Sequence, residues 1–453
     1  MAIIRQASLF DLQDLYDLEP PHRFDEVFSA INIDPILWGG VKKIPGGTPL
    51  QLNYPAMIHA LLIRILERIP TIKDLVRRLR HDVKFQLDCG FLFSDAVPSE
   101  ASFSRLVTKI QHAEVLASVQ SDVLVQVFME GSITDDTVAI DATHLKARDL
   151  APVKEEKSEK MKESPTKRGR KTKAEQEAWR QEQTEKEAAL SLYDKKIEDQ
   201  LDASVDLLRA EVPMDPKWGI KKNSEGKNVF WFGYKGQFAV GAQSQYILQS
   251  LFSSGNLNDG KAAIALLKGV KKQLPDLDVT YYTMDAAYDA PAIYQQVHQN
   301  GSSSVIAYNK RNEAEALGFD KHFAPTCVRV HSYRYDSYDP RYETLKYTRP
   351  KECATCPLAR DSLCQKVYKV KIKQNLRRYN APARGSKAWK TIYNRRTAIE
   401  RVIGYLKEFF QLNNIRYRKG KRANVHFDLV HLLYNGAKLA CDRLTERMNE
   451  QHA

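Results

Sequence analysis

Apolar residues recur at helical spacing in the first part of the chain. They recur every three or four positions between residues 54 and 81, and Pro70 interrupts the pattern. These apolar positions are Ile58, Leu61, Leu62, Ile65 and Leu66. A second helix is expected after the proline, and residues 98–100 (Pro-Ser-Glu) are typical of a helix start. We therefore expect an N-terminal helical domain over residues 1–130, which suits DNA binding and suits a plain helical bundle nearly as well.

The middle of the chain changes from helical spacing to strands that alternate with helices. Strands are predicted over residues 137–141, 229–240, 246–252 and 279–284, and an amphipathic helix over residues 261–274. From Lys387 the pattern is helical again. This alternation indicates an α/β fold, and we place its core in residues 131–319 and 373–453.

Two segments interrupt the predicted core. Residues 150–200 form a charged insertion, with 13 basic and 12 acidic side chains between residues 154 and 200 and helical character from residue 174 to 192. Residues 320–372 are rich in Tyr, Arg, Val and Cys without a helical period. We predict a small Cys-rich β insertion there.

Positive charge is concentrated in one part of the chain. The formal net charge is +13, and residues 371–422 hold 16 Lys and Arg against the two acids Glu400 and Glu408. Such a localised excess, interleaved with tyrosines, favours a nucleic-acid partner over a merely solubilising surface. No long apolar run or secretory signal occurs, so we expect no membrane partner. Six cysteines in 453 residues fit a reducing cytosol.

Two aspartates follow predicted strands. Asp141 ends the strand at residues 137–141, and Asp285 follows the strand at residues 279–284. Carboxylates at the rim of a sheet can share divalent cations, although aspartates at strand ends often only cap turns.

A third acidic residue lies in a specific pattern on a predicted helix. Tyr393, Arg396, Glu400 and Lys407 are spaced by 3, 4 and 7 residues, which places them within roughly 60° on one helix. An apolar stripe lies beside them, formed by Ile392, Ile399, Val402, Leu406 and Phe410. One helix would thus present a carboxylate flanked by two cations and a phenol; the alternative is a basic surface helix with one chance glutamate.

These residues resemble those of a known family. The pattern Y-x2-R-x3-E-x6-K resembles the signature of DDE transposases encoded by bacterial insertion sequences. Asp141 and Asp285 are similar to the two aspartates of that family, and Phe-Gly-Tyr-Lys at residues 232–235 resembles the strand after the first aspartate. Residues 54–110 are similar to the family's N-terminal helical domain, so the resemblance covers most of the chain. The charged insertion is the departure.

The resemblance implies a ribonuclease H-like catalytic core in which Asp141, Asp285 and Glu400 are catalytic and hold two Mg²⁺ or Mn²⁺ ions, about 3.5–4 Å apart. It implies metal-dependent cleavage at transposon ends and strand transfer into target DNA. The partners would be double-stranded DNA, as terminal inverted repeats and target, and a second copy of the chain in a DNA-bound homodimer. The location would be the bacterial cytoplasm, associated with the nucleoid. Candidate phosphate contacts are Tyr393, Arg396, Lys407, Lys235, Arg377, Arg378 and Arg401.

Four cysteines lie close together in the Cys-rich β insertion. Cys353, Cys356 and Cys364, with Cys327 upstream, have the spacing of a structural Zn²⁺ site. Free thiols in a β-rich insertion are the alternative.

Two other functions fit the same residues. One is a catalytically silent, sequence-specific DNA-binding protein derived from a transposase, which the complete set of acids and cations argues against. The other is a nuclease of the same fold, which would cleave DNA without joining strands.

Overall fold

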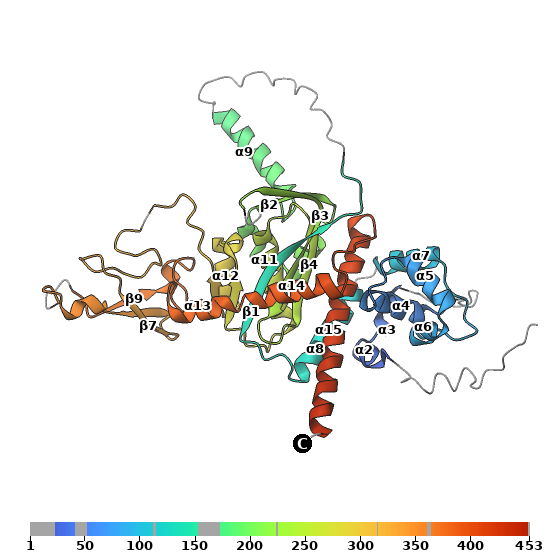
Figure 1. The fold of residues 1–453 in the computed structure, drawn as a ribbon. Helices are drawn as coiled ribbons and strands as arrows, with labels where there is room; N and C mark the ends of the chain where they lie inside the picture. Colours follow the sequence, from blue (N-terminus) through green and yellow to red (C-terminus); the bar gives the residue numbers. More distant parts are fainter. Residues whose placement is uncertain are drawn as a thin grey trace, which may run out of the picture. The chain divides into compact units, whose positions relative to one another are not determined.

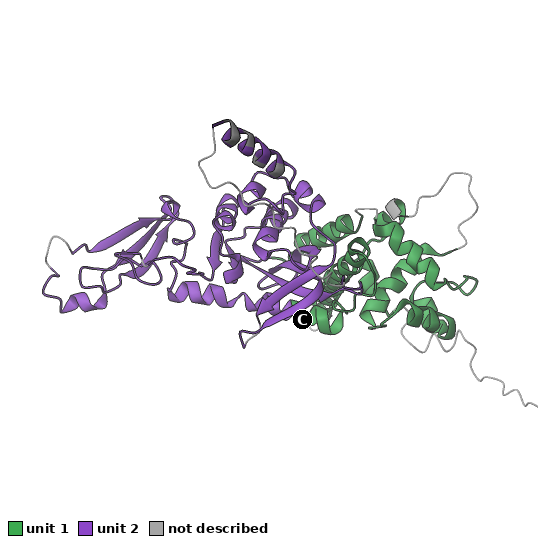
Figure 2. Cartoon of the chain, turned by 90° about the horizontal axis from the view of Figure 1, so that it is seen from above, with its two compact units in different colours: residues 1–133, 403–453 green, residues 134–402 purple. Residues whose placement is uncertain are grey.

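The computed structural model describes most of the chain. The described residues are 23–40, 52–111, 115–152, 173–222, 225–314, 316–359 and 364–451. Residues 153–172 of the charged insertion lie outside them. By internal contacts the chain divides into two compact units, one formed by residues 1–133 and 403–453 and the other by residues 134–402 (Figure 2).

The first unit is helical (Figure 1). Its helices are α2 (Asp25–Ser29), α3 (Asp34–Gly40), α4 (Tyr54–Leu66), α5 (Ile72–His81), α6 (Val83–Asp88), α7 (Glu100–Gln111), α8 (Val115–Met129) and α15 (Gly420–Gln451). The predicted break at Pro70 is confirmed, since α4 ends at Leu66 and Thr71 caps α5 by accepting from the Asp74 N–H.

The long C-terminal helix belongs to this helical unit. We expected residues 403–453 in the core, but α15 packs against α8, α2, α7 and α4. Its buried residues include Phe427, Leu432 and Leu439, so its apolar face is covered there. Within the described residues, no helix has the length and apolar character needed to cross a membrane.

The second unit is built on a six-stranded mixed sheet. Its strands are β1 (Thr137–Lys146), β2 (Lys217–Lys222), β3 (Asn228–Gly241), β4 (Ile247–Ser254), β5 (Tyr281–Met284) and β6 (Ser303–Ile306). The order is β2-β3-β1-β5-β6, with β4 also paired to β3. Strand β3 is antiparallel to β1, β2 and β4, whereas β5 is parallel to both β1 and β6. The predicted α/β architecture is thus confirmed.

The second unit also contains helices, some of which pack on this sheet. They are α9 (Lys173–Ala188), α10 (Val205–Ala210), α11 (Asp259–Gln273), α12 (Pro291–Gln299), α13 (Lys387–Asn394) and α14 (Thr397–Phe409), with short 3₁₀ turns at η1 (Ile197–Gln200), η2 (Ala286–Tyr288), η3 (Lys351–Ala354) and η4 (Ile372–Gln374). Helix α11 contacts β4, β3 and β1, while α13 contacts β5 and β6. Helix α14 spans the boundary between the two units.

The Cys-rich region contains its own small antiparallel sheet. Strands β7 (Arg334–Asp339), β8 (Thr344–Thr348) and β9 (Val367–Lys371) are arranged in that order. Leu345, Tyr347 and Val370 are central to its small apolar core.

Candidate active site

Two neighbouring parallel strands bring the first two acids together. In the β1–β5 pair Ala139 lies opposite Thr283, so two residues further along Asp141 lies beside Asp285. Neighbouring strands are about 4.8 Å apart, and residues two positions apart share a face of the sheet. The two carboxylates therefore leave the sheet side by side.

Their local settings differ. Asp285 directly follows β5 and caps η2, where its Oδ1 accepts the Ala287 N–H at 2.8 Å. Asp141 does not end its strand, as we had predicted; it lies within β1 and pairs with Phe238, because antiparallel pairing with β3 continues to Lys146. Its Oδ1 accepts the N–H of Ala142 at 2.8 Å.

Arg396 links the third acid to the first. Its Nη1 lies 3.2 Å from Asp141 Oδ2, and its Nη2 lies 2.6 Å from Glu400 Oε1. Glu400 is in the first turn of α14, and half of its side chain is exposed. The structure thus places three acids that are far apart in sequence around one region, with Arg396 between two of them.

The predicted single helix is interrupted at this point, which is a correction. α13 ends at Asn394 and α14 begins at Thr397, so Arg396 lies in the link between the two helices. The apolar stripe itself is confirmed, because all five of its members are buried: Ile392, Ile399, Val402, Leu406 and Phe410. The stripe continues across the link, whereas the polar face does not follow one helix.

Burial raises the pKa values of the two aspartates. It is the main cause that brings the pKa of Asp141 to about 6, and the charge of Asp285 adds to the rise, against the Ala142 N–H and Arg396. The pKa of Asp285 is also raised, again mainly by burial. Negative charge in this region is therefore incompletely compensated, which is a property of cation sites and of functional sites more generally.

A fourth carboxylate belongs to the same region and was missed in the sequence. Asp259 begins α11, and its charge raises the pKa values of both Asp141 and Asp285. In the sequence Asp259 looks like an ordinary helix-start residue after Asn258, so no signal distinguished it. Its partner is Lys235, whose Nζ lies 2.7 Å from Asp259 Oδ1 and 2.8 Å from the Leu257 carbonyl oxygen. Lys235, a predicted phosphate contact, is thus held at this carboxylate.

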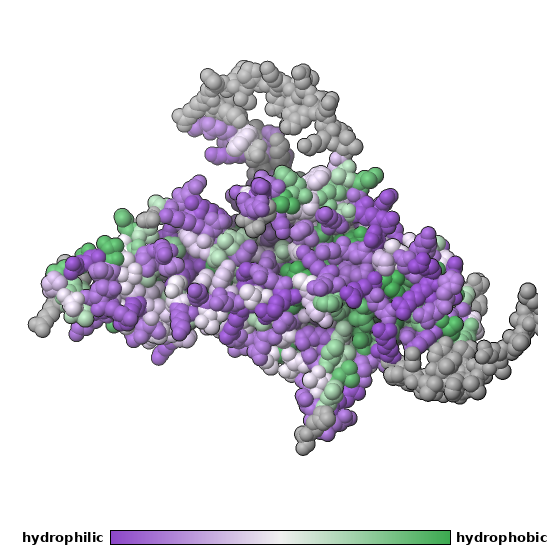
Figure 3. All heavy atoms as spheres, viewed as in Figure 1, coloured by the Kyte–Doolittle hydropathy of each residue, from purple (hydrophilic) through white to green (hydrophobic). Residues whose placement is uncertain are grey.

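Other predicted phosphate contacts lie on α13 and α14. The ring of Tyr393 stacks on that of Trp389, with centroids 4.8 Å apart, and Arg396 lies over the Tyr393 ring. Arg401 is exposed and donates to Thr397. Lys407 is in the last turn of α14, in the part that belongs to the helical unit. Helix α14 lies on the mostly hydrophilic face drawn in Figure 3.

The two arginines of the basic segment are paired with acids. Arg377 contacts Asp289 and Glu313 and keeps only 12% of its side chain exposed, while Arg378 lies 3.4 Å from Glu313. This burial argues against the direct phosphate contact that we predicted for Arg377, because its guanidinium is already occupied by carboxylates.

The three acids have the ligand type that a hard divalent cation prefers. The carboxylates of Asp141, Asp285 and Glu400 supply the oxygen ligands that Mg²⁺ and Mn²⁺ prefer. Among the described residues, however, no group of three or more His, Cys, Asp or Glu side chains has the arrangement of a metal site. Arg396 stands between Asp141 and Glu400, so side chains must adjust before a cation is held.

The four predicted zinc ligands gather around one small cavity. Cys327, Cys353, Cys356 and Cys364 all line a cavity of about 20 Å³, roughly the space of one water molecule. Burial and the other three thiols raise the pKa of Cys353. The cysteines are brought together, yet in the described part of the chain they do not form a closed metal-binding arrangement.

Comparison with known proteins gives the family. Residues 133–435 match the family described as "Transposase DDE domain", and residues 13–109 match "Transposase domain (DUF772)". No curated protein matches the chain. A cryo-EM structure of the piggyBac transposase synaptic complex with hairpin DNA is similar at 11% identity and a TM-score of 0.38, covering 94% of this chain and 74% of that one, which is a weak similarity. The first family match spans well over half of the sequence, and the chain therefore belongs to the DDE transposases, enzymes of DNA transposition.

Proposed function

We propose that this transposase is of the bacterial insertion-sequence type and that Asp141, Asp285 and Glu400 are its catalytic acids. The observation that carries the proposal is Arg396, which contacts both Asp141 and Glu400 while the β1–β5 register sets Asp141 beside Asp285. The order of antiparallel and parallel strands supports a ribonuclease H-like core. In this core the enzyme cleaves transposon ends and transfers the strand into target DNA.

The three carboxylates would hold Mg²⁺ or Mn²⁺. Two such ions, when bound, activate the attacking oxygen and stabilise the leaving oxygen of a phosphoryl transfer. Asp141 and Asp285 suit this role, because both are partly buried and each feels the negative charge of Asp259, and a bound cation would relieve this repulsion. Arg396 then has its guanidinium available for a phosphate, which it can bind with two parallel hydrogen bonds.

The DNA partner is double-stranded, as terminal inverted repeats and as target. Arg396, Tyr393, Lys407 and Arg401 lie along α13 and α14, where they would contact its phosphates. Recognition of the ends falls to the helical unit, whose residues 13–109 match a transposase domain. Joining two ends requires a homodimer on DNA.

Substitution of each acid tests the assignment. Asp141→Asn, Asp285→Asn and Glu400→Gln should each lower Mg²⁺-dependent cleavage of a duplex carrying the element's terminal repeats by roughly a thousandfold or more. Binding to the same duplex, measured by gel shift, should remain. Asp278→Asn is the matched control, because Asp278 is exposed and precedes β5. Normal cleavage by any one acid variant removes that residue from the site, and cleavage without strand joining identifies a nuclease instead.

We also infer that the cysteine cluster holds a structural Zn²⁺. The support is chemical, since four thiols line one cavity in a region whose sheet has only a small apolar core. Elemental analysis of the purified protein should find about one zinc per chain, and a Cys353→Ser/Cys356→Ser variant should lose it. If both proteins contain almost no zinc, the four cysteines are free thiols and the zinc proposal is wrong.

A further inference from the structure

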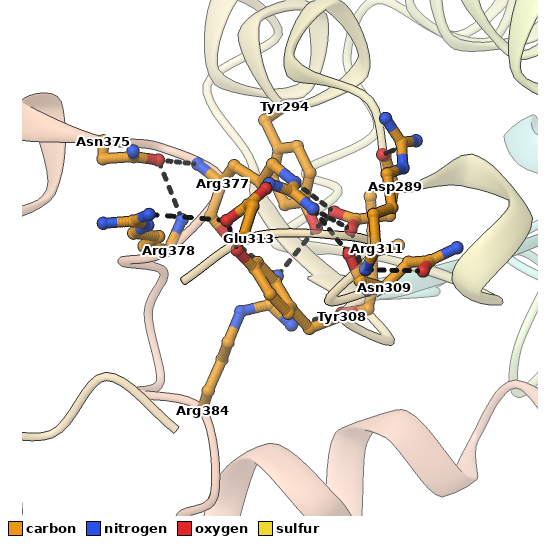
Figure 4. Close-up of polar contacts among 11 residues, drawn as sticks. Asp289, Tyr294, Tyr308, Asn309, Arg311, Glu313, Asn375, Arg377, Arg378 and Arg384 are labelled. Carbon is orange, nitrogen blue, oxygen red and sulfur yellow. Dashed lines mark hydrogen bonds and ion pairs between the residues drawn. The ribbon is translucent and has the colours of Figure 1, made fainter. Parts of the chain in front are cut away.

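Another carboxylate lies close to Asp285 in the sequence and has no solvent exposure. Asp289 comes four residues after Asp285, and its side chain is fully buried. Its Oδ1 accepts from the Tyr294 hydroxyl at 2.8 Å, and its Oδ2 accepts from the Asn309 N–H at 2.8 Å (Figure 4). Arg377 adds two further donors, Nε at 3.0 Å and Nη2 at 2.8 Å. The carboxylate thus has four donors, enough to keep a buried charge in place.

The guanidinium of Arg377 also has several hydrogen-bond partners. Besides Asp289, it donates from Nη1 to Glu313 and from Nη2 to the Asn309 carbonyl oxygen at 2.8 Å. Burial lowers its pKa, but the hydrogen bonds to Asp289 and Glu313 more than reverse this, so the pKa is raised. Hydrogen bonds from Tyr308 and Arg377 lower the pKa of Glu313 to about 2. Glu313 is therefore ionised at neutral pH.

This cluster ties together segments that are distant in sequence. Arg384, also buried, donates to the Tyr294 hydroxyl at 2.7 Å, to the Arg377 carbonyl oxygen at 2.9 Å and to the Ile306 carbonyl oxygen. The connected parts are the loop after β5, the start of α12, the end of β6 at Ile306 with the residues up to 313, and residues 377–384. In Figure 4 these side chains converge from several separate segments.

The link from Asp289 back to Asp285 is short and hydrogen-bonded. The Tyr288 N–H donates to the Asp285 carbonyl oxygen at 3.2 Å, and the Ala287 N–H donates to its side chain at 2.8 Å. Through this single 3₁₀ turn, the position of Asp289 determines where the Asp285 carboxylate lies. In metal sites, residues that contact the metal ligands commonly hold those ligands in a fixed orientation.

We propose that Arg377 is a positioning residue: paired with Asp289, it holds the loop on which Asp285 stands and thereby sets the affinity of the site for its divalent cation. The proposal rests on the function proposed for Asp285. Arg377 then acts by holding this loop and not by contacting DNA. Glu313 keeps Arg377 in place by accepting a hydrogen bond from its Nη1.

The test measures the Mg²⁺ concentration that half-saturates cleavage. Arg377→Lys keeps a positive charge but loses the two-pronged contact with Asp289. Its half-saturating Mg²⁺ concentration should rise roughly 10- to 100-fold, with cleavage largely recovered at high Mg²⁺. Glu313→Gln removes one partner of Arg377 at a partly exposed position and should give a smaller rise of about threefold. Arg341→Lys is the matched control, because Arg341 is exposed in the turn between β7 and β8.

The outcomes separate this proposal from the assignment of the acids. If Arg377→Lys is folded and binds DNA, but its half-saturating Mg²⁺ equals that of the wild type, the proposal is overturned and Arg377 is only a structural residue. If Arg377→Lys does not fold, Glu313→Gln decides by the same measurement. If Asp285→Asn cleaves normally, the proposed site itself fails, whatever Arg377 does.

Discussion

Two clusters of one arginine and two carboxylates lie in the same unit and differ in how fully they are paired. In the first, Arg396 bridges Asp141 and Glu400, and Glu400 remains half exposed. In the second, Arg377 bridges Asp289 and Glu313, and Asp289 is fully buried with four donors. Equal composition therefore does not mean equal role: the first cluster leaves oxygen atoms free for a ligand, whereas the second has none to spare on Asp289.

The largest effect that separates the clusters is on folding. Asp289→Asn should lower the free energy of unfolding by about 3 kcal/mol, because it leaves Arg377 buried without its main counter-charge. Asp141→Asn should leave the free energy of unfolding unchanged or slightly higher, since it removes one of two crowded like charges. Denaturant titration of both variants without metal measures this. Equal losses of stability would mean that the two clusters do the same structural work.

A smaller effect distinguishes the clusters by pH. The pKa of Asp141 is raised from 3.8 to about 6, so between these values the folded, metal-free protein holds a proton that the unfolded chain has lost, and stability from this group falls as pH rises. Protons compete with the cation at the same oxygens. The half-saturating Mg²⁺ concentration should therefore be about tenfold higher at pH 5 than at pH 7.

Glu313 of the second cluster should not change its protonation over this pH range. The pKa of Glu313 is about 2, so it stays ionised from pH 5 to 7. In Glu313→Gln the ratio of the two half-saturating concentrations should match that of the wild type. A flat profile in the wild-type enzyme would contradict the raised pKa of Asp141.

The sequence predicted what depends on local periodicity. The helix break at Pro70, the strand at residues 137–141 and the buried stripe from Ile392 to Phe410 all follow from the spacing of apolar residues. The catalytic acids stay predictions, which came from the strand ends and from the signature spacing together.

Features that depend on distant pairing could not be predicted. Asp141 lies inside β1 only because β3, almost a hundred residues later, extends the ladder past it. Arg377 looked like part of a basic DNA-binding segment, since nothing near it in sequence reveals that Asp289 lies against it. Asp259 looked like a helix cap, and its approach to Asp141 comes from the packing of α11 on the sheet.

The interruption between α13 and α14 has a consequence for how this protein tolerates change. In the link, Arg395 Nη1 lies 2.7 Å from Asp136 Oδ1, just before β1, and its neighbour Arg396 contacts Asp141 within β1. These two consecutive side chains thus hold two positions of the chain that lie five residues apart. An inserted or deleted residue here would turn Glu400 by about 100° and move it about 1.5 Å along the axis. The number of residues in this link therefore fixes the position of Glu400. Related enzymes should accept substitutions within the link far more readily than an insertion or a deletion.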